Sequence, residues 1–203
     1  MVKEIRVYVE GGGDSVESRA QMREGFTVFF NKLHTMPEVK ILVVACGTRG
    51  NAYRDFMAAW EDHPDAFNVL LVDSEIGVTT DPWSHLALHD QWLFEDHHHV
   101  HCHLMVQIME AWFLADRDAL KIFFGTGFRE EKLPRTTSVE NITKGTIRVK
   151  LNAATRYSYK GKYHKIHHAS KILKILDLNK VRSAAPHCDR LFTTLAEKIG
   201  VAL

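Results

Sequence analysis

Three acidic residues follow two apolar segments of the chain. Glu10 comes directly after residues 5–9, and Asp73 and Glu75 follow residues 67–72. Carboxylates that meet in a low-dielectric pocket repel one another, and their pKa values rise unless a cation neutralises them. A hard divalent cation such as Mg²⁺ or Mn²⁺ takes oxygen ligands of this kind. The three residues therefore predict a metal site, provided that the fold brings them together.

The apolar segments before these acids have the pattern of buried β-strands, and turn residues followed by a helical pattern come after the first of them. Three glycines at 11–13 allow a tight turn and a close approach of a phosphate. Asp14 or Ser15 then caps a helix. In an open parallel sheet, ligands bind beyond the carboxyl ends of the strands, where the strand order reverses. We therefore expect the strand-end acids to converge at that edge.

The periodicity predicts an α/β fold with a Rossmann-like, mostly parallel sheet of about four strands. The predicted strands are residues 5–9, 40–44, 67–72 and 103–107. The predicted helices are a first helix ending near residue 33, then 52–61, 108–124 in one or two pieces, 138–141, 146–155, 168–176, 179–183 and 186–199. Residues 76–96 are expected to form an ordered loop with about one helical turn. Turn residues after 124 divide the chain into a catalytic core at 1–125 and a basic helical region at 126–203 that packs on it.

Positive charge is concentrated in one part of the chain. Residues 140–182 hold eleven Lys and Arg and two acids, a net charge of +9, and because the whole chain carries +1 the rest carries −8. This asymmetry favours a polyanionic partner, and cations interleaved with aromatic rings suit phosphate contacts and base stacking. The alternative is a solvated loop, or one that binds the acidic surface of a partner protein. The predicted nucleic-acid contacts are Lys144, Arg156, Lys160, Lys162, Tyr163, Lys165 and His168.

Five further polar residues are candidates for the same site. Arg49 and Asn51 follow the second strand, where Arg49 would clamp a phosphate and stabilise charge developing on it, unless it is simply a solvated turn residue. Glu110 and Asp116 are six residues apart, a net rotation of about 240°, so at most one of them faces the crevice. Glu110 is nearer to the strand end and is the better candidate for binding a metal or orienting a water, with a surface acid as the alternative. Asp14 is a candidate fourth metal ligand.

Five histidines lie between residues 97 and 103. Consecutive side chains of an extended segment point to opposite faces, and no remote Cys/His pair at zinc-finger spacing completes a tetrahedral set. We expect a solvated loop before the fourth strand, from which His103 alone is placed to enter the site. The alternative is a mobile loop whose histidines contact phosphates or bases. The three cysteines are widely spaced and outside any CxxC pattern, and we expect them to be reduced.

The strand-end motifs resemble those of the Toprim domain. In that family a glutamate before a glycine ends the first strand, and a DxD-type pair ends a later one. The matching residues here are Glu10 with Gly11 in VEGGGD and Asp73 with Glu75 in VDSE, where many members have aspartate as the second acid of the pair. The resemblance implies the metal-dependent catalytic fold of topoisomerases, primases and the overcoming-lysogenization-defect nucleases.

Nearly the full length of the chain resembles the bacterial domain-of-unknown-function family numbered 4276. The segments that carry this resemblance are VEGGGDS, ACGTRGNAY, LLVDSE, HLMVQIMEAWFLADRDAL, KGKYHKIHHA and AAPHCDRL. Members of the family look Toprim-like, and the Toprim relatives imply a role in bacterial anti-phage defence beside a partner ATPase.

Together these features predict a Mg²⁺- or Mn²⁺-dependent nuclease in which Glu10, Asp73 and Glu75 hold one or two ions. The alternative is a non-catalytic subunit that binds nucleic acid or a nucleotide beside an ATPase. A small-molecule phosphatase or phosphotransferase ranks lowest, because VDSE lacks a DxDxT pattern and a small substrate gives no reason for the basic region. No apolar segment approaches the ~20 residues that span a bilayer and no signal-peptide pattern is present, so we expect a cytoplasmic protein without membrane contact. DNA or RNA as the substrate, and a homo-oligomer, are left open.

Overall fold

A four-stranded parallel sheet forms the centre of the protein. The computed structural model describes residues 2–33, 39–93 and 99–201. The strands lie in the order β2-β1-β3-β4, and every neighbouring pair is parallel. Their bounds are Glu4–Val9 for β1, Lys40–Ala45 for β2, Phe67–Asp73 for β3 and Cys102–Met105 for β4. The predicted Rossmann-like α/β fold is therefore confirmed.

The strand order reverses between β1 and β3. From β1 the chain runs to β2 on one side and then returns to place β3 on the other side of β1, with Val7 aligned with both Val43 and Val69. The carboxyl ends of β1 and β3 therefore lie next to each other at the switch point, which is where open α/β sheets bind ligands.

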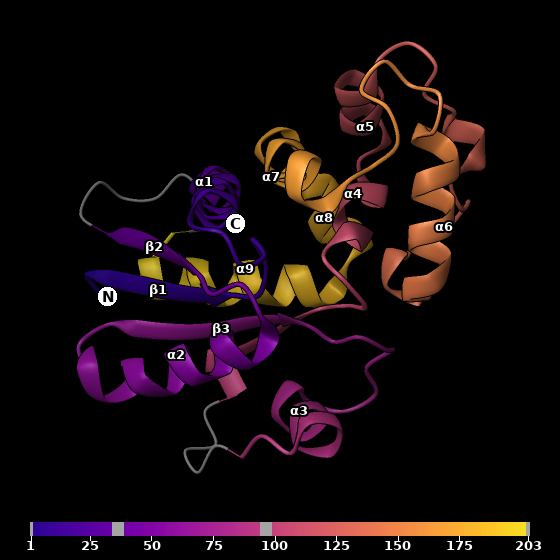
Figure 1. Ribbon diagram of the computed structural model, residues 1–203. Helices are drawn as coiled ribbons and strands as arrows, with labels where there is room; N and C mark the ends of the chain where they lie inside the picture. The colour runs from indigo at the N-terminus through magenta and orange to yellow at the C-terminus, as the bar shows by residue number, and fades with distance from the viewer. Residues whose placement is uncertain (1, 34–38, 94–98, 202–203) are drawn as a thin grey trace.

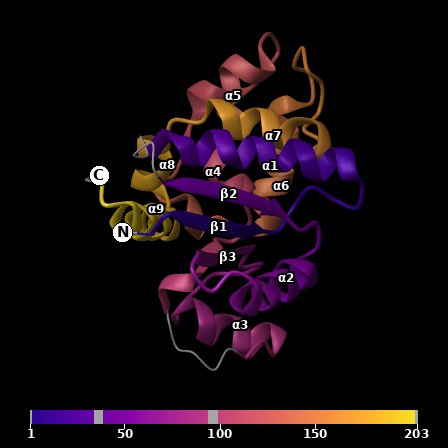
Figure 2. The same ribbon diagram turned by 90° about the vertical axis from the view of Figure 1, so that its left-hand side faces the viewer.

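Helices cover both faces of the sheet. Alternate strand residues point to opposite faces, so Val7 and Leu71 belong to one hydrophobic cluster and Tyr8 and Leu70 to another. Figures 1 and 2 show α1 (Val16–Phe30) and α7 (Lys165–Ile175) on one side, with α2 (Arg49–Asp62) and α3 (Pro82–Asp90) on the other. The strands are thus buried on both faces, as their nearly continuous apolar sequence predicts.

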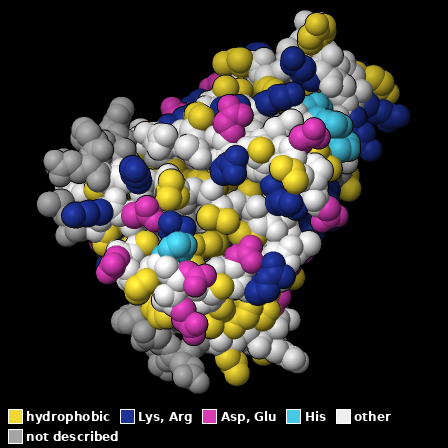
Figure 3. Space-filling model, turned by 60° about the vertical axis from the view of Figure 1, so that its left-hand side comes forward, with side chains coloured by type: hydrophobic (Ala, Val, Ile, Leu, Met, Phe, Trp, Pro, Cys, Tyr) yellow, Lys and Arg dark blue, Asp and Glu magenta, His cyan; other side chains and the backbone are white. Residues whose placement is uncertain are grey.

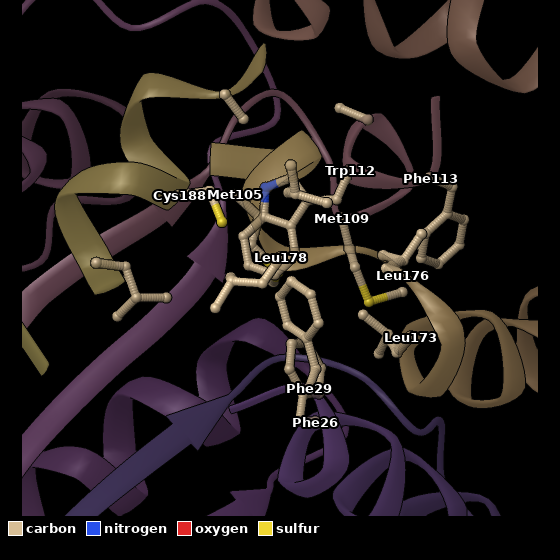
Figure 4. Packing of buried hydrophobic residues seen from close by; sticks show 14 of the residues in the cluster. Phe26, Phe29, Met105, Met109, Trp112, Phe113, Leu173, Leu176, Leu178 and Cys188 are labelled. Atoms are coloured by element: carbon tan, nitrogen blue, oxygen red, sulfur yellow. The ribbon is translucent and has the colours of Figure 1, made fainter. Parts of the chain in front are cut away.

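The C-terminal helices share the larger of these two cores with the sheet. Trp112 lies against Phe26 and Phe29 of α1, with ring centroids 6.4 and 5.7 Å apart, and Figure 4 shows these rings together among residues of several helices. Phe192 adds an edge contact to Phe29 at 5.3 Å. The remaining helices are α4 (Glu110–Ala115), α5 (Arg117–Phe124), α6 (Lys144–Thr155), α8 (Leu178–Ala184) and α9 (Pro186–Ile199). Residues 1–125 and 126–203 therefore contribute to one continuous hydrophobic cluster.

Side-chain caps decide where several helices begin. Ser15 caps α1 by accepting from the Ser18 N–H at 3.0 Å. Thr48 caps α2, which therefore starts at Arg49, three residues earlier than its apolar pattern indicates. Single 3₁₀ turns occupy Asn31–Leu33, His99–His101, Glu130–Lys132 and Val139–Asn141. None of the described helices combines the length and the apolar character needed to cross a membrane.

The expectation of a loop with about one helical turn at residues 76–96 is wrong in one respect, because α3 forms a helix of nine residues there. Asp81 accepts from the Ser84 N–H at 3.1 Å and Pro82 occupies the first turn, which is the usual arrangement at a helix start. Asp116 caps α5 in the same way and separates it from α4, so the helix predicted at 108–124 forms two pieces.

Candidate metal centre

Three carboxylates lie together beyond the switch point of the sheet. One oxygen from each of Glu10, Asp73 and Glu75 lies within 4.8 Å of the other two. The Asp73 N–H donates to Glu10 Oε2 at 3.1 Å, which ties the ends of β1 and β3 together. Two oxygens on one Mg²⁺ with bonds of 2.0–2.1 Å are at most about 4.2 Å apart. Only one pair among three oxygens on an octahedral ion can lie that far apart, and the other pairs lie about 2.9 Å apart. The flexible glutamates would therefore draw in toward Asp73 when they bind one ion.

Asp73 is the most deeply buried of the three, with 3% of its surface exposed. Burial raises its pKa to about 7; Lys165 opposes this shift, and Glu10 and Glu110 add to it. Its Oδ1 accepts from the Met109 N–H at 2.8 Å, and its Oδ2 lies 3.6 Å from Lys165 Nζ. Burial also raises the pKa of Glu10. Carboxylates held this way gain most from a bound cation, since a cation removes their repulsion.

Glu75 is held in position by a contact with the segment after β4. Its backbone has φ +68°, a left-handed conformation that is unusual for a glutamate, and its N–H donates to the Gln107 carbonyl at 2.8 Å. Gln107 Oε1 accepts from the Lys144 N–H at 2.9 Å, and Lys144 Nζ forms an ion pair with Glu75. Burial and the nearby Arg148 lower the pKa of Lys144. Gln107 therefore brings Lys144 and Glu75 together.

A fourth acid, Glu110, lies next to this cluster. Glu110 is 5% exposed, its Oε1 accepts from the Tyr163 hydroxyl at 2.9 Å, and Lys165 Nζ lies 3.9 Å from the same oxygen. Its Oε2 has no hydrogen-bond partner among the residues that the structure describes. A buried carboxylate oxygen without a donor is costly, so a water or a cation at this position would stabilise it. Asp116 lies elsewhere, where it caps α5 and accepts from the Asp177 N–H at 2.8 Å.

Arg49 and Asn51 stabilise the loops around the site. Arg49 donates to Asp90 through Nε at 2.8 Å and Nη2 at 2.6 Å. Its Nη1 donates to the Asp73 carbonyl and lies 3.9 Å from Glu10 Oε2. The Asn51 amide donates to the Cys46 carbonyl at 3.2 Å. In this arrangement Arg49 orients the end of β3, and a phosphate would have to compete with Asp90 for its guanidinium.

Asp14, which was predicted as a fourth ligand, is exposed and lies outside the cluster of three carboxylates. Its backbone carbonyl accepts from Arg19 at 2.8 Å.

The residues predicted to bind nucleic acid separate into two groups. Lys144, Tyr163 and Lys165 turn toward the carboxylates, as the contacts above show. Burial and the neighbouring Glu110 raise the pKa of Tyr163 well above its usual value, so its hydroxyl stays a hydrogen-bond donor. Burial lowers the pKa of Lys165, but the surrounding carboxylates outweigh it and the net shift is upward. These two side chains are therefore part of the candidate metal centre.

The second group lies on the surface of the loop before α7. Arg156 and Lys162 are exposed; the Arg156 guanidinium lies 5.1 Å from the Tyr157 ring, and Lys160 Nζ lies 5.7 Å from the ring of Tyr159, which is itself 82% exposed. His168, the remaining residue of the predicted set, is half-buried against the phenylalanines that end α5. Figure 3 shows lysine, arginine and histidine side chains gathered toward the upper end of one face of the molecule, the end at which α5 and this loop lie in Figure 1.

The described histidines of the 97–103 segment have separate partners. His99 lies 3.3 Å from Asp81, and His101 Nδ1 hydrogen-bonds to the Asn68 carbonyl at 2.6 Å. His103 is fully buried, and its Nδ1 lies 3.0 Å from Arg190 of α9. Burial and the positive charge of Arg190 lower the pKa of His103 to about 3. Residues 97–98 lie outside the described ranges, and the three cysteines are buried thiols.

Sequence reasoning missed three residues that shape this centre. Gln107 brings Lys144 to Glu75, Asp90 binds Arg49, and Arg148 lies near enough to lower the pKa of Lys144. The basic composition of residues 140–182 includes Arg148, but no local pattern distinguishes it from its neighbours. Gln107 and Asp90 act through partners about 40 residues away, which no spacing rule reveals.

Comparison with known proteins identifies the family of the chain. Residues 9–196 match the family described as "Domain of unknown function (DUF4276)", a span that contains all the carboxylates of the candidate centre. No curated protein and no solved structure matches the chain. The matched span covers most of the sequence, and the expected family membership is confirmed: the chain belongs to the DUF4276 family.

Proposed function

We propose that this protein is a divalent-metal-dependent nuclease of Toprim type that hydrolyses phosphodiester bonds in DNA or RNA. The observation that carries the proposal is the convergence of Glu10, Asp73 and Glu75 at the switch point of the sheet. Beside them, the buried Oε2 of Glu110 has no hydrogen-bond partner in the described part of the chain and adds a further ligand position. Mg²⁺ or Mn²⁺ is the fitting ion, because the donor set consists of carboxylates.

The carboxylates would hold the ion, and a bound ion supplies Lewis-acid polarisation of the phosphate and a water of lowered pKa. Lys165 and Lys144 form ion pairs with these carboxylates and would become available to the phosphate when a cation replaces them. Arg49 orients Glu10 and the end of β3.

The basic surface supports a polyanionic substrate. Arg148, Arg156, Lys160 and Lys162 are all exposed, and the exposed ring of Tyr159 lies beside Lys160. Cations next to an exposed aromatic ring bind phosphates and stack a base without reading sequence. We place such an activity in bacterial anti-phage defence beside a partner ATPase, on the strength of the Toprim-like motifs alone.

Cleavage assays on matched variants test the proposal. Single- and double-stranded DNA and RNA are incubated with the protein in Mg²⁺, in Mn²⁺ and in EDTA. We expect Asp73→Asn and Glu10→Gln to abolish cleavage and to leave binding in a gel shift largely intact. Asp62→Asn is the control, because Asp62 is an exposed acid at the end of α2. Full activity of Glu10→Gln in Mg²⁺ would show that the role given to Glu10 is wrong.

One observation favours a second function, that of a non-catalytic nucleic-acid- or nucleotide-binding subunit beside an ATPase. Lys144 and Lys165 pair with the carboxylates, as they would if the acids had only a structural role. A gel shift with and without Mg²⁺ separates the two functions: binding without cleavage by the wild-type chain under every metal condition supports the subunit, and metal-dependent cleavage supports the nuclease.

A further inference from the structure

A cavity of about 410 Å³ opens beside the candidate metal centre. It lies between the glycine loop at 11–13, the first turns of α1 and the start of α7. Glu10 and Lys165 line this cavity and also belong to the carboxylate centre. A group bound in the cavity is therefore adjacent to whatever the carboxylates hold. The volume falls within the range of about 300–1,000 Å³ that is usual for small-molecule sites.

The walls of the cavity suit a flat heterocyclic ring. Met22 and Ile166 supply apolar side chains, and Ser18 and Ser170 are polar residues of the lining. The two hydroxyls donate to the Ser15 and Gln21 carbonyls and keep a lone pair that can accept a hydrogen bond. A thioether makes favourable contacts with aromatic rings. The glycine loop is itself required: a Cβ on Gly12 would lie 2.8 Å from the Arg19 Cα, so the loop backbone packs directly on α1.

The size and the walls distinguish among ligands for this cavity. A lone metal ion or phosphate would leave most of the volume unfilled, and neither has use for apolar walls. A nucleobase has an apolar face and polar edges, and in a nucleic-acid strand it is joined through its sugar to a phosphate. The carboxylates that bind a metal and the cavity that fits a base would thus engage neighbouring parts of one nucleotide.

We propose that this cavity takes the base of one unpaired nucleotide, so that the substrate is single-stranded nucleic acid or an unpaired segment of it. A base inside a duplex is paired and stacked, and must leave the stack at a cost of a few kcal/mol before it can enter a pocket. The inference rests on the proposed function for the adjacent phosphate. Base binding can nevertheless be measured without any cleavage.

Ile166 is the residue to change, because it lines the cavity from the surface of α7. It is 44% exposed, so Ile166→Trp partly fills the cavity without replacing a core residue. Ile175→Trp is the matched control: Ile175 belongs to the same helix and is 43% exposed. Nine residues of helix rotate it by about half a turn from Ile166.

The probe is a single-stranded DNA dodecamer with one 2-aminopurine, whose emission is quenched by stacking and recovers when the base leaves the stack. Binding is followed in Ca²⁺, with folding of each variant checked by circular dichroism. We expect the wild-type protein and Ile175→Trp to increase the emission on binding. For Ile166→Trp we expect no increase and binding about tenfold weaker, the size of one lost base contact.

Wild-type binding with no change of emission would overturn the inference even if Ile166→Trp failed to fold. Equal binding of the strand by Ile166→Trp and the wild type would overturn it as well. Binding of free AMP by a protein on which the strand shows no change of emission would also overturn it, because the cavity would then take a free mononucleotide. Failure of the proposed function has a different signature: the emission would rise and depend on Ile166, while no strand would be cut in Mg²⁺ or Mn²⁺.

Discussion

Replacing Asp73 by asparagine should stabilise the protein in the absence of metal. Burial raises the pKa of Asp73 from the ordinary value of 3.8 to about 7, a shift of about three units. At 1.36 kcal/mol per unit, ionisation of this carboxyl costs the folded state up to about 4 kcal/mol above pH 7. Asparagine retains an oxygen for the Met109 N–H and never ionises, so that cost disappears.

The sign of the pH dependence follows from the direction of the shift. Because the folded pKa is raised, the folded state binds more protons than the unfolded state between about pH 4 and 7. The contribution of Asp73 to stability is therefore fully present below pH 3.8 and is lost as the pH rises through 7. We expect Asp73→Asn to match the wild type near pH 4 and to exceed it by about 2–4 kcal/mol at pH 8.

Urea unfolding in EDTA at several pH values measures this difference, with Asp62→Asn as a control that should stay within about 0.5 kcal/mol of the wild type. Adding Mg²⁺ at about 100 times its dissociation constant should then stabilise the wild type by about 2.7 kcal/mol and leave Asp73→Asn unchanged. The reasoning is refuted if Asp73→Asn is less stable than the wild type at pH 8 in EDTA.

Three further changes test other parts of the centre and of the fold. Lys144→Met removes the cation that competes with a metal ion for Glu75. Calorimetric titration should therefore show that Mn²⁺ binds the variant about fivefold more tightly, or by ~1 kcal/mol, and an unchanged Mn²⁺ affinity would contradict the competition. Tyr163→Phe removes a buried hydrogen bond to a carboxylate and should lower the free energy of unfolding in urea by about 1–3 kcal/mol, whereas a neutral result would mean that the bond is not formed in solution. Gly127→Ala should lower the free energy of unfolding by more than about 2 kcal/mol, because Gly127 has φ +83° and an added Cβ would lie 2.0 Å from the Tyr157 carbonyl oxygen. Thermal melting followed by circular dichroism checks this prediction, and an unchanged melting temperature would refute it.

The sequence by itself determined the strands and the acids that end them. Residues 5–9 and 67–72 are short, apolar and followed by turn residues, and such local signals specify a buried parallel strand wherever the segment lies in the fold. Since the carboxyl ends of parallel strands share one edge of the sheet, the positions of Glu10 and Asp73 also followed from the sequence. The segment that forms α3 lacks clear helical periodicity, and the Asp81–Pro82 pair that starts the helix is equally typical of a turn, so its nine residues could not be predicted.

Only the tertiary structure decided which side chains surround the acids. Lys144, Tyr163 and Lys165 have the composition of a nucleic-acid-binding loop, but the packing of α6 against α4 and of α7 against α1 turns them toward Glu75 and Glu110. Their partners lie 53 to 69 residues away in the chain for the Tyr163 and Lys144 contacts. Contacts over such separations depend on how whole helices pack, because helix packing is set by the shared hydrophobic core and not by the local pattern around each charged residue.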